Sequence, residues 1–259
     1  MRLKIKLKLK SGRLMTPNYQ YQLGAAIYNL LDFGSPEFGR FLHDIGFEAG
    51  GKKFKLFTYA LRFEKFRFEG RIMHLIGDEA FLYITSPRID DFIRHVITGS
   101  FESKMLVLEG FTRNEFTIVQ MEMLPEEKFG NAAHLKLLSP MVASKPVANG
   151  SNKQAYYLRP ADTEELDRIL SANLSKKYQI ISSEKDYQGE VAVRFDDKYL
   201  AENKRVTKKI TIDERGEHPI DVIGIQAPFT ITGPPELIAT GYEAGFGEKN
   251  SMGFGMAER

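Results

Sequence analysis

The chain has 259 residues and a formal net charge of +2, and its 42% hydrophobic and 27% charged residues are typical of a folded globular protein. It contains no cysteine, which excludes disulfides, thiolate zinc sites, iron–sulfur clusters and a cysteine nucleophile. Because no apolar run approaches the roughly 20 residues of a membrane span, and the N-terminus lacks the apolar core of a signal peptide, we expect a cytoplasmic protein with no membrane partner.

The first half of the chain predicts strands and helices in the order β, α, β, β, α, β. Residues 2–10 alternate apolar and basic side chains, as in a half-buried strand. Ser35 is a candidate N-cap and Pro36 a candidate first residue of the second of two consecutive helices. The expected elements are helices at 19–31 and 35–45, strands of one sheet at 55–63, 71–76 and 80–85, a helix opened by Ser86 and Pro87, and strands at 105–108 and 115–123.

The second half repeats this order without visible sequence repetition. The best boundary is Leu124–Pro125, followed by a polar stretch that extends to Asn131. The expected elements are strands at 134–138, 189–195, 205–212, 220–232 and 251–257 and helices at 163–178 and 234–242. The chain therefore predicts an α+β fold of two tandem ferredoxin-like (βαββαβ) domains with antiparallel sheets, residues 1–125 and 132–259, and a C-terminal glycine-rich loop.

Five glycines fall between residues 241 and 255, a density that is difficult to explain by packing alone. Glycine permits positive φ and close approach of a ligand, and exposed N–H groups beside Lys249 predict an anion site suited to phosphate. A dinucleotide-binding fingerprint would need glycine in place of Asn250. A Walker loop would need Gly-Lys-Ser/Thr, but Glu248 precedes Lys249. Both nucleotide-cofactor readings are excluded.

The glycine-rich segment resembles the C-terminal signature of the repeat-associated RNA-binding (RAMP) superfamily, in its branch of CRISPR repeat-processing endoribonucleases. The resemblance extends to three segments near the N-terminus at spacings typical of that family. They are Gly24-Ala-Ala-Ile-Tyr28-Asn29 on the first helix, Phe41-Leu42-His43 on the second, and Lys55-Leu-Phe-Thr-Tyr59 entering a strand. It therefore involves both ends of the chain.

This resemblance implies an enzyme that cuts precursor CRISPR RNA within each repeat, without metal or other cofactor, by attack of a ribose 2′-hydroxyl on the adjacent phosphate. The family's tyrosine, histidine and lysine correspond to Tyr28, His43 and Lys55. Histidine suits general acid–base catalysis, and lysine suits stabilisation of phosphorane charge. The acid and base roles of His43 and Tyr28 stay open. Because the segment before Lys55 is expanded, Lys52 or Lys53 is an alternative catalytic lysine.

RNA binding requires cations along a groove and aromatic faces for unstacked bases. Phe246 and Phe254 are expected to anchor the loop on the core instead of stacking on bases. His43 is expected at the edge of the core stripe that Phe38, Phe41, Leu42 and Ile45 form on its helix. The candidate RNA-binding residues are Lys52, Lys53, Arg205, Lys208, Lys209, Gly245, Gly247, Lys249, Gly253 and Gly255.

Two other functions are compatible with parts of this pattern. The chain could be a non-catalytic RNA-binding CRISPR subunit, although such a protein has no need of Tyr28, His43 and a nearby lysine together. It could also be an interaction protein whose glycine loop docks a partner. The expected partner is CRISPR repeat RNA, and the sequence leaves open whether the protein joins an effector complex and whether it is a monomer or a homodimer.

Overall fold

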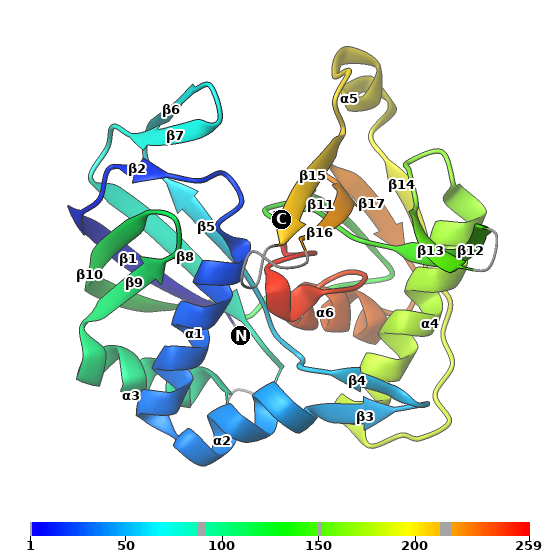
Figure 1. Ribbon diagram of the computed structural model, residues 1–259. Coiled ribbons are helices and arrows are strands. Elements are labelled where there is room, and N and C mark those ends of the chain that lie inside the picture. Colours follow the sequence, from blue (N-terminus) through cyan, green and yellow to red (C-terminus); the bar gives the residue numbers. More distant parts are fainter. Residues whose placement is uncertain (1, 88–91, 150–151, 213–218) are drawn as a thin grey trace.

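The computed structural model describes residues 2–87, 92–149, 152–212 and 219–259, and its two largest sheets, both antiparallel, lie side by side with their helices (Figure 1). One hydrophobic core lies beneath each sheet, and a third, smaller one lies at a hairpin of the second half. Among the described residues, no helix is both long and apolar enough to cross a membrane.

The first sheet has the strand order of a ferredoxin-like fold, as predicted. β1 is central because it pairs with β8 on one side and with β10 on the other, and its apolar face, Leu3, Ile5 and Leu7, is fully buried against helices α1 and α3. Part of the helix predicted after Pro87 falls on residues 88–91, which lie outside the described residues. The order is β5 (Thr58–Phe63), β8 (Glu79–Thr85), β1 (Arg2–Ser11), β10 (Arg113–Leu124) and β9 (Met105–Glu109), with α1 at Gln20–Gly34 and α3 at Arg94–Ser103.

Residues 71–76 contain a strand, as predicted, but this strand does not join the first sheet, so the prediction that it belongs to that sheet was wrong. β7 (Ile72–Leu75) instead forms a separate small sheet with β6 (Phe66–Glu69) and β2 (Leu14–Met15). Gly70, at φ +60°, lies in the tight turn that joins β6 to β7. The hairpin is an insertion between β5 and β8, which pair directly with each other.

The second predicted helix divides in two. Ser35 caps α2 (Pro36–Arg40) as expected, because its Oγ accepts a hydrogen bond from the N–H of Phe38 (3.3 Å). A π-helical turn, η1 (Phe41–Ile45), follows. The N–H of Gly46 donates to the Phe41 oxygen (2.9 Å), and this wider turn rotates Ile45 to the surface, where it is 56% exposed. The expectation that Ile45 belongs to the core stripe was therefore wrong.

The expanded segment before Lys55 forms a hairpin of β3 (Phe47–Ala49) and β4 (Lys52–Phe54). This hairpin reaches across to α4 (Thr163–Ser182) of the second half, as Figure 1 shows. The Nζ of Lys176 on α4 donates a hydrogen bond to the Gly50 oxygen (3.1 Å). A segment of the first half therefore packs on a helix of the second.

The second sheet also has the ferredoxin-like strand order, which confirms the predicted fold class. Helix α4 packs on it together with α6 (Pro235–Ala244). The strand predicted at 251–257 was wrong for most of its length, because residues Asn250–Met252 form a 3-10 turn, η3. The order is β14 (Ala192–Phe195), β17 (Phe229–Thr232), β11 (Ala132–Leu137) and β18 (Ala257–Glu258).

Two hairpins extend from this second sheet. The first is formed by β15 (Thr207–Ile212) and β16 (Ile220–Ile225), because the predicted strand 220–232 is divided near Pro228 and only β17 enters the sheet. The short helix α5 (Asp197–Glu202) lies before β15. The second is formed by β12 (Ser144–Asn149) and β13 (Asn152–Tyr157), in a segment for which the sequence predicted no strands.

The cap of α2 gives a first testable prediction. Ser35→Ala leaves the N–H of Phe38 without its side-chain acceptor, so we expect the free energy of unfolding to fall by about 1 kcal/mol in urea titrations. Ser35→Gly is the matched control, with an expected loss of only a few tenths of a kcal/mol, since glycine is itself tolerated at N-caps. Equal losses in the two variants would contradict the capping role.

Candidate active site

Tyr28, His43 and Lys55 line one pocket of about 510 Å³. Tyr28 comes from α1, His43 from the π-turn η1, and Lys55 from the segment that leads from β4 to β5. The far wall includes Ser251 and Met252 of η3, which belong to the glycine-rich loop. The structure thus brings the three predicted catalytic residues together and closes their pocket with the other end of the chain.

The rings of Tyr28 and His43 meet edge to face, with centroids 5.4 Å apart and an interplanar angle of 82°. Phe57 contacts Tyr28 in a second edge-to-face arrangement, with centroids 5.9 Å apart. Burial raises the pKa of Tyr28 to about 12. Its hydroxyl therefore keeps its proton at neutral pH and can donate a hydrogen bond to a substrate oxygen.

His43 is the exposed member of the set, with 71% of its side chain accessible. Its Nδ1 lies 2.8 Å from Oδ1 of Asp44, so Asp44 orients the ring. In that arrangement Nε2 is the nitrogen left for proton transfer to or from a bound molecule. The π-turn that moves Ile45 outward is the same element that carries His43 to the pocket.

Among the three candidate catalytic lysines, the geometry favours Lys55. Its Nζ donates a hydrogen bond to the backbone oxygen of His43 (2.5 Å). Burial and the nearby charge of Lys53 lower the pKa of Lys55, while Asp44 opposes the shift. Lys52 and Lys53 lie on β4 and line only the neighbouring pocket.

That neighbouring pocket, which we call the lysine pocket, has a volume of about 280 Å³ and is lined by five lysines. It lies where the β3–β4 hairpin, α4 and the glycine-rich loop meet, and it shares Lys55 and Ser251 with the first pocket. Such a concentration of cations suits a phosphate of the RNA backbone. The lysines are Lys52, Lys53, Lys55, Lys177 and Lys249.

The glycines of the loop are buried and take positive φ, between +74° and +86°. A Cβ at Gly247 would collide with the Val142 oxygen, and one at Gly253 would come within 2.7 Å of the Tyr59 ring. Packing against the protein thus accounts for these glycines, contrary to the expectation from their density. The four glycines that share this conformation are Gly245, Gly247, Gly253 and Gly255.

Phe246 and Phe254 are fully buried, which confirms that they anchor the loop on the core. The loop also bonds to its surroundings through its backbone. The N–H of Glu248 donates to the Val142 oxygen (2.8 Å) and that of Gly255 to the Pro140 oxygen (2.8 Å). These N–H groups are used within the protein, whereas the side chain of Lys249 is exposed at the lysine pocket.

Lys177 is the important residue that the sequence analysis missed. It is 2% exposed, and its Nζ donates to the Gly245 oxygen (2.6 Å), the Gly247 oxygen (3.0 Å) and Oδ1 of Asn250 (2.8 Å). Burial lowers the pKa of Lys177 to about 7, and the charge of Glu248 opposes the shift. The signal was present, because Lys177 continues the apolar stripe of Leu170 and Leu174 on α4.

The structure does not bring the three basic residues of the β15 region to either pocket. Arg205 lies in the segment between α5 and β15, and Lys209 pairs with Asp221 across the hairpin (2.8 Å). Lys208 lines a narrow cleft with Tyr19 and Tyr59, and loss of hydration there lowers the pKa of Lys208. These residues lie apart from Lys52, Lys53 and Lys249.

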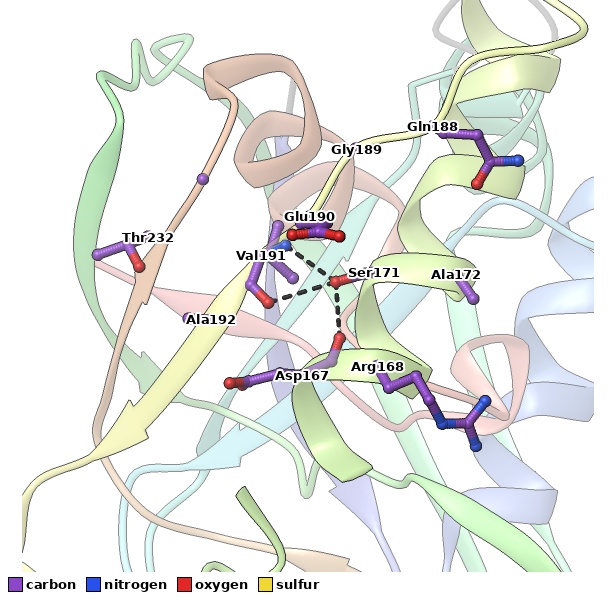
Figure 2. Close-up of a pocket in the computed structure, with 11 residues that line it drawn as sticks. Asp167, Arg168, Ser171, Ala172, Gln188, Gly189, Glu190, Val191, Ala192 and Thr232 are labelled. Carbon is purple, nitrogen blue, oxygen red and sulfur yellow. Dashed lines mark hydrogen bonds between the residues drawn. The ribbon is translucent and has the colours of Figure 1, made fainter. Parts of the chain in front are cut away.

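A wider pocket of about 870 Å³ lies between α4 and the edge strand β14 (Figure 2). Ser171 on α4 accepts a hydrogen bond from the N–H of Val191 (2.9 Å), and Asp167 accepts one from the N–H of Val193 (2.7 Å). These side chains satisfy the outward N–H groups at this edge of the sheet and protect it from pairing with another strand. None of the predicted site residues lines this pocket.

Two family models together cover most of the chain. The model described as "CRISPR-associated protein Cas6, N-terminal" matches residues 15–121, and that described as "CRISPR associated protein Cas6, C-terminal" matches residues 124–259. Each match contains part of the site, since Tyr28, His43 and Lys55 fall in the first and the glycine-rich loop in the second.

Individual relatives extend over nearly the whole chain. CRISPR-associated endoribonuclease Cas6 1 of Methanocaldococcus jannaschii is 32% identical over 99% of this chain and 91% of its own length. CRISPR-associated endoribonuclease Cas6 of Pyrococcus furiosus is 27% identical over 93% and 82%. A solved structure described as CRISPR associated protein Cas6 superposes with a TM-score of 0.73 and 30% identity, covering 100% of this chain and 98% of its own.

The loop geometry predicts that Gly247→Ala destabilises the fold more than Gly51→Ala. Both glycines have positive φ, near +76° and +70°, so each substitution costs about 1–2 kcal/mol of backbone strain. Only at Gly247 does the new methyl group meet a backbone oxygen, whereas nothing lies within 4 Å of the corresponding position at Gly51. Urea unfolding of both variants measures the difference, and equal losses would contradict the tight packing of the loop.

Proposed function

The chain belongs to the Cas6 family of CRISPR-associated proteins, and from this premise we propose that it is an endoribonuclease that cuts CRISPR repeat RNA in precursor transcripts to release guide RNAs. The observation that carries the proposal is the convergence of Tyr28, His43 and Lys55 on one pocket that adjoins the lysine pocket at Lys55 and Ser251. A protein that only bound RNA would need the cations of the second pocket and not the acid–base set of the first.

In the proposed reaction the ribose 2′-hydroxyl attacks the adjacent phosphorus and the bond to the 5′-oxygen of the next nucleotide breaks. The 2′-hydroxyl loses one proton and the leaving oxygen gains one, so the products are a 2′,3′-cyclic phosphate and a 5′-hydroxyl. His43 accepts the proton of the 2′-hydroxyl at Nε2 and returns a proton to the leaving 5′-oxygen, Tyr28 donates a hydrogen bond from its protonated hydroxyl, and Lys55 stabilises the phosphorane charge. Each of these tasks falls to a side chain, so the proposed mechanism is independent of metal ions.

The two halves have different tasks in this proposal. Residues 1–125, as one domain, supply the catalytic residues together with Lys52 and Lys53. Residues 132–259, as the other, supply the glycine-rich loop and Lys249. The lysine pocket holds a backbone phosphate beside the scissile one, since it adjoins the catalytic pocket at Lys55 and Ser251. Arg205, Lys208 and Lys209 contact RNA further along, outside both pockets.

The nucleophile can be tested on the substrate. A repeat RNA with deoxyribose at the single nucleotide 5′ of the cut lacks the attacking hydroxyl, so we expect no cleavage and nearly unchanged affinity. The matched control carries deoxyribose one nucleotide further upstream and is expected to be cut. Undiminished cleavage of the first substrate would indicate attack by water and would contradict the mechanism.

The role of His43 in proton transfer can be tested by substitution. We expect His43→Ala to lower the single-turnover cleavage rate by at least about 10²-fold, the scale of a lost acid–base group, and repeat-RNA affinity by less than about tenfold. Tyr28→Phe should cause a smaller loss of rate, because it removes one hydroxyl. His134→Ala, which changes an exposed histidine on β11 outside both pockets, is the control. Wild-type cleavage by His43→Ala would remove this histidine from the mechanism.

A further inference from the structure

The buried ammonium group of Lys177 occupies an unusual position for a lysine. It projects from α4 beneath the glycine-rich loop and is enclosed by protein, with 2% of the residue exposed. An ammonium group has three N–H donors, and all three are used, on Gly245, Gly247 and Asn250. Lys177 therefore has no donor left for a phosphate, although it lines the lysine pocket.

The three acceptors bracket the part of the loop that forms the pocket walls. Gly245 and Gly247 come before Lys249, and Asn250 comes directly after it. The Nδ2 of Asn250 in turn donates to the Phe254 oxygen (3.0 Å). This bond links the three hydrogen bonds of Lys177, which we call the clamp, to the turn that follows. Lys249 itself has positive φ (58°), a conformation that non-glycine residues seldom adopt without support from their surroundings.

We propose that Lys177 is a positioning residue for RNA cleavage, whose hydrogen bonds to the loop hold Lys249 and Ser251 at the junction of the two pockets. This inference rests on the proposed function and deepens it, because it assigns a role to a residue that does not touch the substrate. Lys249 is exposed and lines the lysine pocket, and Ser251 lines both pockets, as Lys55 does.

The charge environment supports this role. The charged side chains that face the lysine pocket are Glu248 and Lys249 from the loop and Lys52, Lys53 and Lys55 from the hairpin and the segment after it. Burial disfavours the charged form of Lys177, and the charge of Glu248 favours it. The three oxygen acceptors and Glu248 hold Lys177 in place, and the cost of burying it appears as its lowered pKa.

The first test needs no RNA. Lys177→Met keeps the length of the side chain and removes its donors, and Asn250→Ala weakens the same clamp from the loop side, should the first variant fold poorly. Arg168→Met is the control, because it removes an exposed cation of the same helix that pairs with Glu165. By hydrogen-exchange mass spectrometry we expect amides of residues 245–255 to exchange at least about tenfold faster in both clamp variants, with β1 and β8 unchanged. Unchanged amide exchange of residues 245–255 would overturn the inference that Lys177 holds the loop.

The second test measures function at a temperature where every variant is folded. We expect Lys177→Met to lower the single-turnover rate at saturating repeat RNA by about 10- to 100-fold, because a small displacement of residues that line an active site lowers the rate on this scale. Arg168→Met should leave the rate unchanged. A role in stability alone would leave the rate of the folded variant unchanged. A wild-type rate in folded Lys177→Met would therefore overturn the positioning role.

A double-mutant cycle on the affinity for uncleavable deoxy-substituted RNA identifies the route of the effect. The losses of affinity caused by Lys177→Met and Lys249→Ala should be less than additive, because Lys177 acts by holding Lys249 against the RNA and both substitutions remove that one contact. The losses caused by Lys177→Met and Lys52→Ala should add, because Lys52 is held by β4 and does not depend on Lys177. Additivity with Lys249→Ala would overturn the proposal. If wild-type protein neither binds nor cuts repeat RNA, the proposed function fails, and the exchange experiment still decides whether Lys177 holds the loop.

Discussion

The ring of Tyr59 lies between helix α1 and the glycine-rich loop, and the pocket that Tyr28, His43 and Lys55 line depends on this contact. A Cβ at Gly24 would come within 2.7 Å of the Tyr59 hydroxyl, and one at Gly253 would come equally close to the ring. The hydroxyl donates to the Gln20 oxygen (3.0 Å), and the adjacent Thr58 donates from Oγ1 to the Phe254 oxygen (2.8 Å). Two glycines far apart in sequence are thus required by one buried ring.

The two halves are fixed to each other at further points around this contact. Arg2 of β1 is 4% exposed, donates to the Ala257 oxygen (2.6 Å), and places its guanidinium 4.2 Å from the centroid of the Tyr242 ring. The β3–β4 hairpin adds a contact to α4 on the other side. Because preorganised groups need little reorganisation during reaction, a junction held by these contacts suits a site whose residues come from both ends of the chain.

Much of this organisation could be predicted from the sequence, where local signals were strong. Alternation in residues 2–10, the cap at Ser35 and the order of elements gave the correct fold class, and the family resemblance named Tyr28, His43 and Lys55, which the structure brings together. The π-turn at 41–45 and the small sheet of β2, β6 and β7 could not be predicted, because hydrophobic periodicity specifies neither hydrogen-bond register nor strand partners. Lys177 was missed because a lysine within an apolar stripe usually extends its ammonium group to solvent, and helix periodicity does not show that acceptors surround it.

The most direct test of the central claim is to map the ends of the products formed from host repeat RNA by purified protein in excess EDTA. The account predicts a single cut within each repeat, with a 2′,3′-cyclic phosphate on the upstream fragment and a 5′-hydroxyl on the downstream fragment. A 5′-phosphate on the downstream fragment, or cleavage that EDTA abolishes and a divalent metal restores, would contradict metal-independent attack by the 2′-hydroxyl.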